Sequence, residues 1–149
     1  MSEPARVLVV AHQTAAFPGL IEAVRERAKR SPARFHLVVP RMARGMHKVV
    51  DPEDTGADDA QVVLDHALPK LSEAAGHEIT GHIGDAEPLM AIHDAINLGR
   101  YDELIISTLP IGISRWLKLD LISKARGLGL PVTHVEAPKD ASVPATATS

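Results

Sequence analysis

Two polar segments directly follow apolar runs, and they hold the side chains best suited to binding or chemistry. His12, Gln13 and Thr14 stand at the end of the run that begins at Arg6, and residues 107–114 stand at the end of the run DELIIST. If both runs are parallel strands, their carboxyl ends meet in a crevice where ligands of such sheets bind. The candidate ligand-binding residues are His12, Gln13, Thr14, Arg41, Ser107, Thr108, Gly112, Ser114, Arg115 and Asp120.

Catalysis has a weaker basis in these residues. His12 is placed to act as an acid or a base, although a packed, hydrogen-bonded histidine is the favoured interpretation. A small hydrolase or transferase could use His12 with Ser107, Thr108 or Ser114. The sequence has no G-x-S-x-G elbow, however, and it indicates no acid partner. We therefore predict no catalytic residue and keep the hydrolase as an alternative.

Metal and thiol chemistry are not predicted. The eight histidines show no H-E-x-x-H or comparable ligand spacing, and the acidic run at residues 51–59 is not an EF-hand loop. The absence of cysteine excludes disulfides, thiolate zinc sites and cysteine nucleophiles. We expect no metal site and no cofactor.

A basic loop follows the second predicted strand. Residues 41–48 carry Arg41, Arg44, His47 and Lys48. Such a loop can fold over the crevice and supply positive charge to an anionic ligand. The alternative is an ordinary solvated loop.

The elements that must position these residues alternate along the chain. Short apolar, β-branched runs predict five strands, and amphipathic patterns between them predict helices. This alternation implies right-handed crossovers and an α/β fold, a five-stranded parallel sheet with helices on both faces. The predicted strands are residues 6–12, 34–40, 77–84, 102–108 and 131–137.

Several helix ends are also predicted. The helix that begins near Asp58 contains Pro69, so we expect a kink or a break there, and Gly76 is its expected end. Asp85 is the expected cap of the next helix, and Asp120 that of the last. A single domain spans residues 1–137, and residues 138–149, which are small, polar and proline-containing, form a flexible tail.

The bulk composition fits a soluble, globular, cytoplasmic protein. The chain has 149 residues, 45% of them hydrophobic and 23% charged, which is enough to bury a core in one domain. The formal net charge of −3 argues against a nucleic-acid partner. The opening MSEPARVLVVAH is not a signal peptide, and no apolar run approaches the length of a membrane span.

The sequence resembles the universal stress protein family. The resemblance covers residues 5–136 and rests on the five-fold alternation, on GDAEPLMAIHDAINLGRYDELIIST and on GISRWLKLDLISKARGLGLPVTHV. It implies a Rossmann-like sheet in the strand order 3-2-1-4-5 and a homodimer. It also implies that ATP-binding members carry an aspartate after strand one, and a Gly-x-x-Gly followed by a Gly-Ser pair after strand four.

Most of that nucleotide site is replaced in this chain. His12 occupies the position of the family's aspartate, and Leu119-Asp120 occupies the position of its Gly-Ser pair. The loop STLPIG keeps only one glycine, Gly112. Pro110 has no N–H to offer a phosphate. As a helix cap, Asp120 would lie about 4 Å from a bound phosphate, and the repulsion between the two charges would cost on the order of 4 kcal/mol. ATP or another adenine nucleotide is therefore disfavoured as a ligand.

The leading hypothesis is a non-catalytic dimer with a degenerate nucleotide crevice, which acts by protein interaction or by sensing a small anionic ligand. A nucleotide-binding protein with an altered phosphate loop is the alternative. The strand order places the fifth strand at an open edge, where an uninterrupted β-branched run is an aggregation hazard unless it is covered. We expect two-fold pairing of this strand to cover it. The predicted dimer interface comprises Val132, Thr133, His134, Val135 and Glu136.

Overall fold

The computed structural model describes residues 4–11, 14–41, 57–85, 87–108 and 115–136, and for residues 57–59 and 115–120 it describes the backbone alone. The chain alternates regularly between strand and helix. The elements are β1 (Ala5–Val10), α1 (Pro18–Arg30), β2 (Ala33–Pro40), α2 (Ala57–Ala75), β3 (Thr80–Gly84), α3 (Pro88–Leu98), β4 (Glu103–Thr108), α4 (Arg115–Arg126) and β5 (Val132–Glu136).

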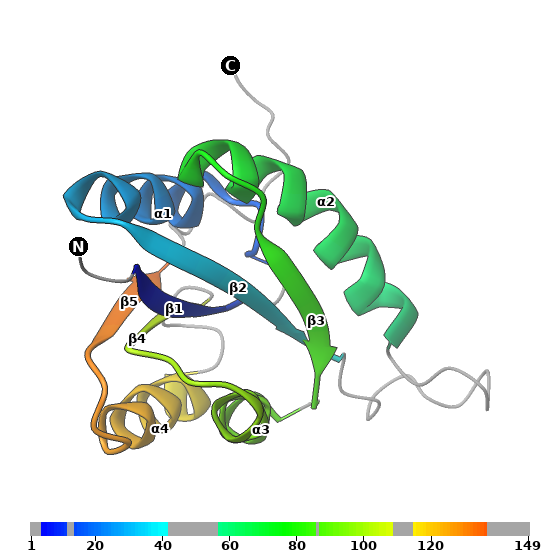
Figure 1. The fold of residues 1–149 in the computed structure, drawn as a ribbon. Coiled ribbons are helices and arrows are strands. Elements are labelled where there is room, and N and C mark those ends of the chain that lie inside the picture. Colours follow the sequence, from blue (N-terminus) through cyan, green and yellow to red (C-terminus); the bar gives the residue numbers. More distant parts are fainter. Residues whose placement is uncertain (1–3, 12–13, 42–56, 86, 109–114, 137–149) are drawn as a thin grey trace.

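The five strands form one parallel sheet in the order β3-β2-β1-β4-β5 (Figure 1). Both the fold class and the predicted strand order are confirmed. In the register, Val9 of β1 lies beside Leu37 of β2 and Ile105 of β4. The central strand is buried on both faces, which is why its sequence is a continuous apolar run with no alternation. All five carboxyl ends point the same way, so the crevice predicted from the sequence lies at that end of the sheet.

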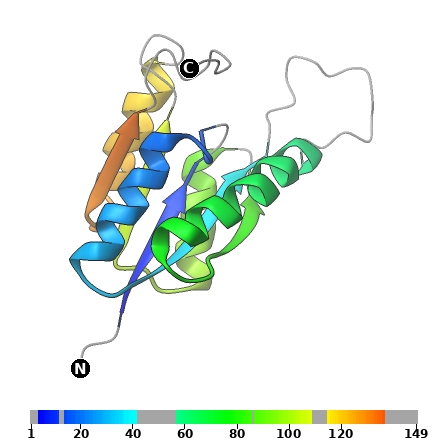
Figure 2. The ribbon, with the colours of Figure 1, turned by 90° about the horizontal axis from the view of Figure 1, so that it is seen from above.

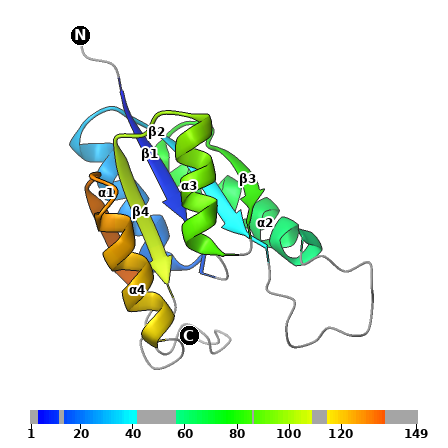
Figure 3. The same cartoon turned by 90° about the horizontal axis from the view of Figure 1, so that it is seen from below.

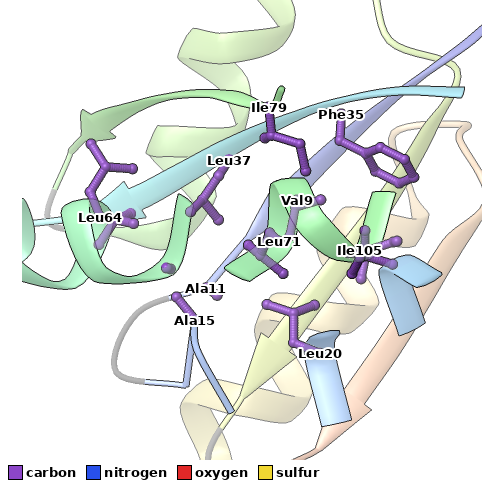
Figure 4. Packing of buried hydrophobic residues seen from close by; sticks show 14 of the residues in the cluster. Val9, Ala11, Ala15, Leu20, Phe35, Leu37, Leu64, Leu71, Ile79 and Ile105 are labelled. Carbon is purple, nitrogen blue, oxygen red and sulfur yellow. The ribbon is translucent and has the colours of Figure 1, made fainter. Parts of the chain in front are cut away.

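Two helices cover each face of the sheet. Figure 2 shows α1 and α2 over one face, and Figure 3 shows α3 and α4 over the other. The core under α1 and α2 includes Leu20, Leu37, Leu64 and Leu71, whose side chains converge in Figure 4. The second core, under α3 and α4, is built mainly from Leu8, Val38, Ile92, Leu104, Ile106 and Ile122. The amphipathic patterns that predicted these helices thus reflect the apolar faces that α1 and α2 bury.

Two glycines in β3 let helices approach the sheet closely. A Cβ on Gly81 would lie 2.8 Å from Leu64 Cδ1 of α2, and one on Gly84 would lie 2.8 Å from Val38 Cγ1 and 2.9 Å from Ala91 Cβ of α3. These distances are below ordinary van der Waals contact. The strand therefore has glycine on each face where a helix packs against it.

The predicted end of α2 is confirmed, and two predicted helix caps are wrong. α2 ends before Gly76, whose φ is +84°, and α3 ends before Gly99, whose N–H donates to Ala95 O. Of the kink or break expected at Pro69, the break does not occur: α2 is continuous, and Pro69 lies on its exposed side, where water can satisfy the carbonyl that it leaves unpaired. Asp85 is not the cap of α3.

The capping residue of α3 is Glu87, because Pro88 suits the first helical position and fixes where the helix begins. Asp85 instead accepts the Glu87 N–H through Oδ1 at 2.9 Å, within the turn before the helix. The second correction concerns α4, which begins at Arg115, so Asp120 lies inside the helix and not at its cap. The stretch RWLKL contains no glycine or proline and consists mostly of good helix formers, so the helix extends past Asp120 toward the crevice.

Candidate crevice at the carboxyl ends of β1 and β4

Two buried hydroxyl groups connect the carboxyl ends of β1 and β4. Thr14 Oγ1 and Ser107 Oγ lie 2.5 Å apart and share a hydrogen bond, although 93 residues separate them in the sequence. Thr14 is 2% exposed and Ser107 is 7% exposed. The structure therefore brings two predicted site residues together, but it buries them as partners of each other.

Thr14 also fixes the path into α1. Its carbonyl oxygen accepts the Phe17 N–H at 3.0 Å, and Phe17 is the residue that precedes the first turn of α1. Pro18 then occupies the first helical position, as its fixed φ favours. The loop after β1 is thus anchored at Thr14 on both its side chain and its main chain.

A second hydroxyl bond links β4 to the edge strand. Thr108 Oγ1 lies 2.7 Å from His134 Nε2 of β5, and both residues are half-buried. His134 was predicted as an interface residue, and its ring bonds to a residue of the same chain. The carboxyl ends of β1, β4 and β5 are therefore joined by two side-chain hydrogen bonds.

The remaining predicted residues are placed as follows. Arg41 lies at the carboxyl end of β2, where its N–H donates to Gly84 O of β3 at 3.1 Å. Arg115 is the first residue of α4, the helix that follows β4 along the chain. His12, Gln13, Gly112 and Ser114 lie outside the described residues, as do Pro110, most of the basic loop after Arg41 and the tail at residues 138–149.

The described part of the crevice holds the hydroxyl pair Thr14–Ser107 and the Thr108 hydroxyl, which is bonded to the His134 imidazole. Ser107 bonds to another hydroxyl and not to a base, so nothing among the described residues activates it as a nucleophile. No group of three or more metal-ligating side chains occurs in the described ranges. No helix in the described part of the chain has the length and apolar character needed to cross a bilayer.

A second polar cluster, at the amino end of the sheet, was not foreseen from the sequence. His36 of β2 contacts Thr80 Oγ1 through Nδ1 and His82 Nδ1 through Nε2, each at 2.7 Å. Burial lowers the pKa of His36, and the neighbouring His82 and Arg6 lower it further. Beside His36, the Arg6 guanidinium lies 5.3 Å from the centre of the Tyr101 ring. These contacts depend on the register of β1, β2 and β3, so no local motif in the sequence could indicate them.

Comparison with solved structures finds the same fold in universal stress proteins. A universal stress protein from Archaeoglobus fulgidus matches with a TM-score of 0.62 and 18% identity over 88% of this chain and 93% of its own. The Archaeoglobus fulgidus protein in complex with dAMP matches with 0.61 and 19% over 91% and 99%. An Arabidopsis thaliana family protein with AMP bound matches with 0.58 and 17% over 96% and 97%. No protein-family model and no curated protein matches the sequence.

Proposed function

We propose that this chain is a non-catalytic binding protein whose crevice, at the carboxyl ends of β1 and β4, takes a small ligand and regulates a protein interaction. The observation that carries the proposal is the buried pair Thr14–Ser107. Hydroxyls held in this way shape the floor of a site and leave a single proton to share with a ligand. They lack the base that a nucleophile would need.

A nucleotide is the second candidate ligand, and the start of α4 favours it. Because α4 begins at Arg115, its N-terminal N–H groups and the positive end of its dipole lie next to the carboxyl end of β4. Asp120 lies more than one turn farther along the helix, so the expected repulsion from a capping carboxylate no longer applies. Adenine nucleotides are present in three structures that share this fold, as cAMP, dAMP and AMP.

Native mass spectrometry of protein purified without added ligand tests both candidates. A co-purified adenine nucleotide would favour the nucleotide-binding alternative, and a different small molecule would favour the sensing of another ligand. Calorimetry with magnesium-ATP then measures the affinity directly. A protein that carries nothing, and that binds neither ATP nor AMP, would leave protein interaction as the function of this fold.

Ser107→Ala provides the matched test of the crevice floor. If a ligand binds there, losing the hydroxyl should weaken binding by several-fold, because one hydrogen bond contributes about 1 kcal/mol. Ser123→Ala, at an exposed position on α4, is the control. Ligand binding that is unchanged in Ser107→Ala would place the ligand elsewhere. Hydrolysis of a nucleotide or ester by the wild type that disappears in this variant would contradict the non-catalytic assignment.

A homodimer through β5 is part of the same proposal. β5 pairs only with β4 among the described strands, and Thr133 on it is exposed. An open strand edge of this kind is a template for pairing with another chain. Two-fold pairing of β5 with its mate would satisfy both edges.

A further inference from the structure

We propose a second ligand site, for a phosphate-type oxyanion, at the amino end of the sheet. It is independent of the crevice, which lies at the opposite end of the strands. The site is a shallow depression of about 510 Å³ on the protein surface. The lining residues on which the proposal depends are Arg6, Arg34, His36, Glu78, Thr80 and Tyr101.

Two arginines lie side by side in this depression. Arg6 of β1 and Arg34 of β2 are register partners in adjacent parallel strands, so their side chains leave the same face of the sheet. Both residues are exposed. Neither guanidinium forms an ion pair with a carboxylate of the described residues, although 16 residues of the chain are lysine or arginine and 19 are acidic. Like charges on neighbouring strands repel one another, and a bound anion would remove this repulsion.

The nearby carboxylates do not neutralise the arginine pair. Asp102 uses Oδ2 to accept the backbone N–H of Arg6 at 2.9 Å. Glu78 lines the depression and is exposed to water. The Arg6 guanidinium lies against Tyr101, a contact that orients it. Burial raises the pKa of Tyr101, so this ring stays neutral beside the cation.

A chain of hydrogen bonds ends at the same depression. His82 Nδ1, His36 Nε2, His36 Nδ1 and Thr80 Oγ1 follow one another through two contacts of 2.7 Å. If His82 donates to His36, the neutral His36 ring donates to Thr80, and the Thr80 hydroxyl proton is free to point outward. An anion in the depression favours this donor order along the hydrogen bonds, from His82 to Thr80, because the anion accepts the Thr80 hydroxyl proton. The guanidinium groups of the two arginines and the Thr80 hydroxyl are hydrogen-bond donors well suited to the oxygens of a phosphate.

The test is a titration of the full-length, ¹⁵N-labelled protein with sodium phosphate, against sodium chloride of equal ionic strength. We expect saturable shifts of the Arg6, Arg34 and Thr80 amide resonances with phosphate only. Arg34→Gln should weaken binding by about tenfold, since a charge-assisted hydrogen bond contributes about 1.5 kcal/mol or more. Among the described residues, the Arg34 side chain forms no hydrogen bond or ion pair that this change would remove. Lys70→Gln, an exposed position on α2 over the other face, should leave binding unchanged.

Any of three results would overturn the proposal. The first is a response to phosphate no larger than the response to chloride, and the second is an equal affinity in Arg34→Gln and the wild type. Saturable shifts confined to Thr14 and Ser107 would likewise overturn it, because they would assign the phosphate to the crevice. A parallel titration with phenyl phosphate identifies the natural source of the anion. Tighter binding than inorganic phosphate indicates a phosphomonoester, and equal or weaker binding indicates the free ion.

Discussion

The guanidinium of Arg27 forms hydrogen bonds with the carboxylate of Glu103 and so connects the last turns of α1 to the first residue of β4. Nε lies 2.8 Å from Oε1, and Nη2 lies 2.6 Å from Oε2. The Arg27 side chain is 6% exposed and that of Glu103 is 23% exposed. Nη1 also donates to Ser31 Oγ at 3.0 Å, just past the end of α1. The hydrogen bonds to Glu103 raise the pKa of Arg27, so its guanidinium stays charged.

Removing one partner of this pair should destabilise the fold. Glu103→Gln leaves the Arg27 charge buried without a counter-charge, and we expect a loss of about 3 kcal/mol in the free energy of unfolding. Urea denaturation measures the loss. Glu22→Gln is the matched control, because its exposed pair with Arg25 on the same helix should contribute little. If both variants lost the same free energy of unfolding, burial would not explain the contribution of the Arg27–Glu103 pair.

The protonation of His36 should make the stability of the fold depend on pH. The folded pKa of His36 is lowered from its ordinary value of 6.5, so the unfolded chain takes up a proton first as the pH falls. The contribution of His36 to stability is therefore complete above pH 6.5 and is lost as the pH falls through that value and then through the lower, folded pKa. The groups that face the ring are His82, Thr80, Arg6 and Tyr101.

Urea unfolding at several pH values, in the wild type and in His36→Gln, tests this account. The wild type should lose stability more steeply below pH 6.5 than the variant does. His66→Gln, which changes an exposed histidine on α2, should keep the wild-type slope. A His36→Gln slope that matches the wild type would show that the acid-sensitive group lies elsewhere.

The close approach of α3 to β3 should make Gly84 intolerant of any side chain. In Gly84→Ala the new Cβ would meet Val38 and Ala91 below 3.0 Å, and neither neighbour is the flexible end of a long side chain. We expect a loss of about 1–3 kcal/mol from overpacking. Gly19→Ala is the control, because its Cβ would lie 3.5 Å from Val135 Cγ1 and a helix favours alanine. Thermal unfolding should show a lower midpoint for the first variant and an unchanged or higher midpoint for the second.

The fold could be predicted from the sequence because each of its signals is local. The run from Arg6 to Val10 is continuously apolar after its first residue, which indicates a strand buried on both faces. The stripe of Ala60, Leu64, Ala67 and Leu71 in α2 has helical spacing, and all four residues are buried. The strand order came from the family resemblance, since local patterns do not determine which strands are neighbours.

The candidate sites were less predictable because they depend on register. Thr14 and Ser107 could be assigned to one crevice from the rule for parallel sheets, but nothing local indicates that they bond to each other. The pair His36–His82 needs the alignment of β2 with β3. Arg27 did leave a signal, a charge seven residues after Leu20 and three after Val24 on the buried stripe, which should have indicated a buried ion pair.

The orientation of the β5 backbone defines how the proposed dimer should be tested. The Leu104 N–H donates to Pro131 O, so the Pro131 carbonyl faces β4. Because peptide groups alternate along a strand, the Thr133 N–H faces β4 as well, and those of Val132 and His134 face the open edge. A proline at position 133 would therefore break the bond to β4 inside one subunit, whereas the exposed Thr133 side chain can be changed without that damage.

Thr133→Lys should convert the dimer to a monomer. Pairing of β5 with its two-fold mate brings both copies of the new lysine to one seam, where like charges repel and must lose water. Sedimentation at micromolar concentration should give about twice the monomer mass of 16.0 kDa for the wild type and the monomer mass for the variant. Thr133→Val keeps the β-branched shape without charge and should stay dimeric. A wild-type chain that sediments as a monomer would refute the assignment, and a folded Thr133→Lys dimer would place the interface on another surface.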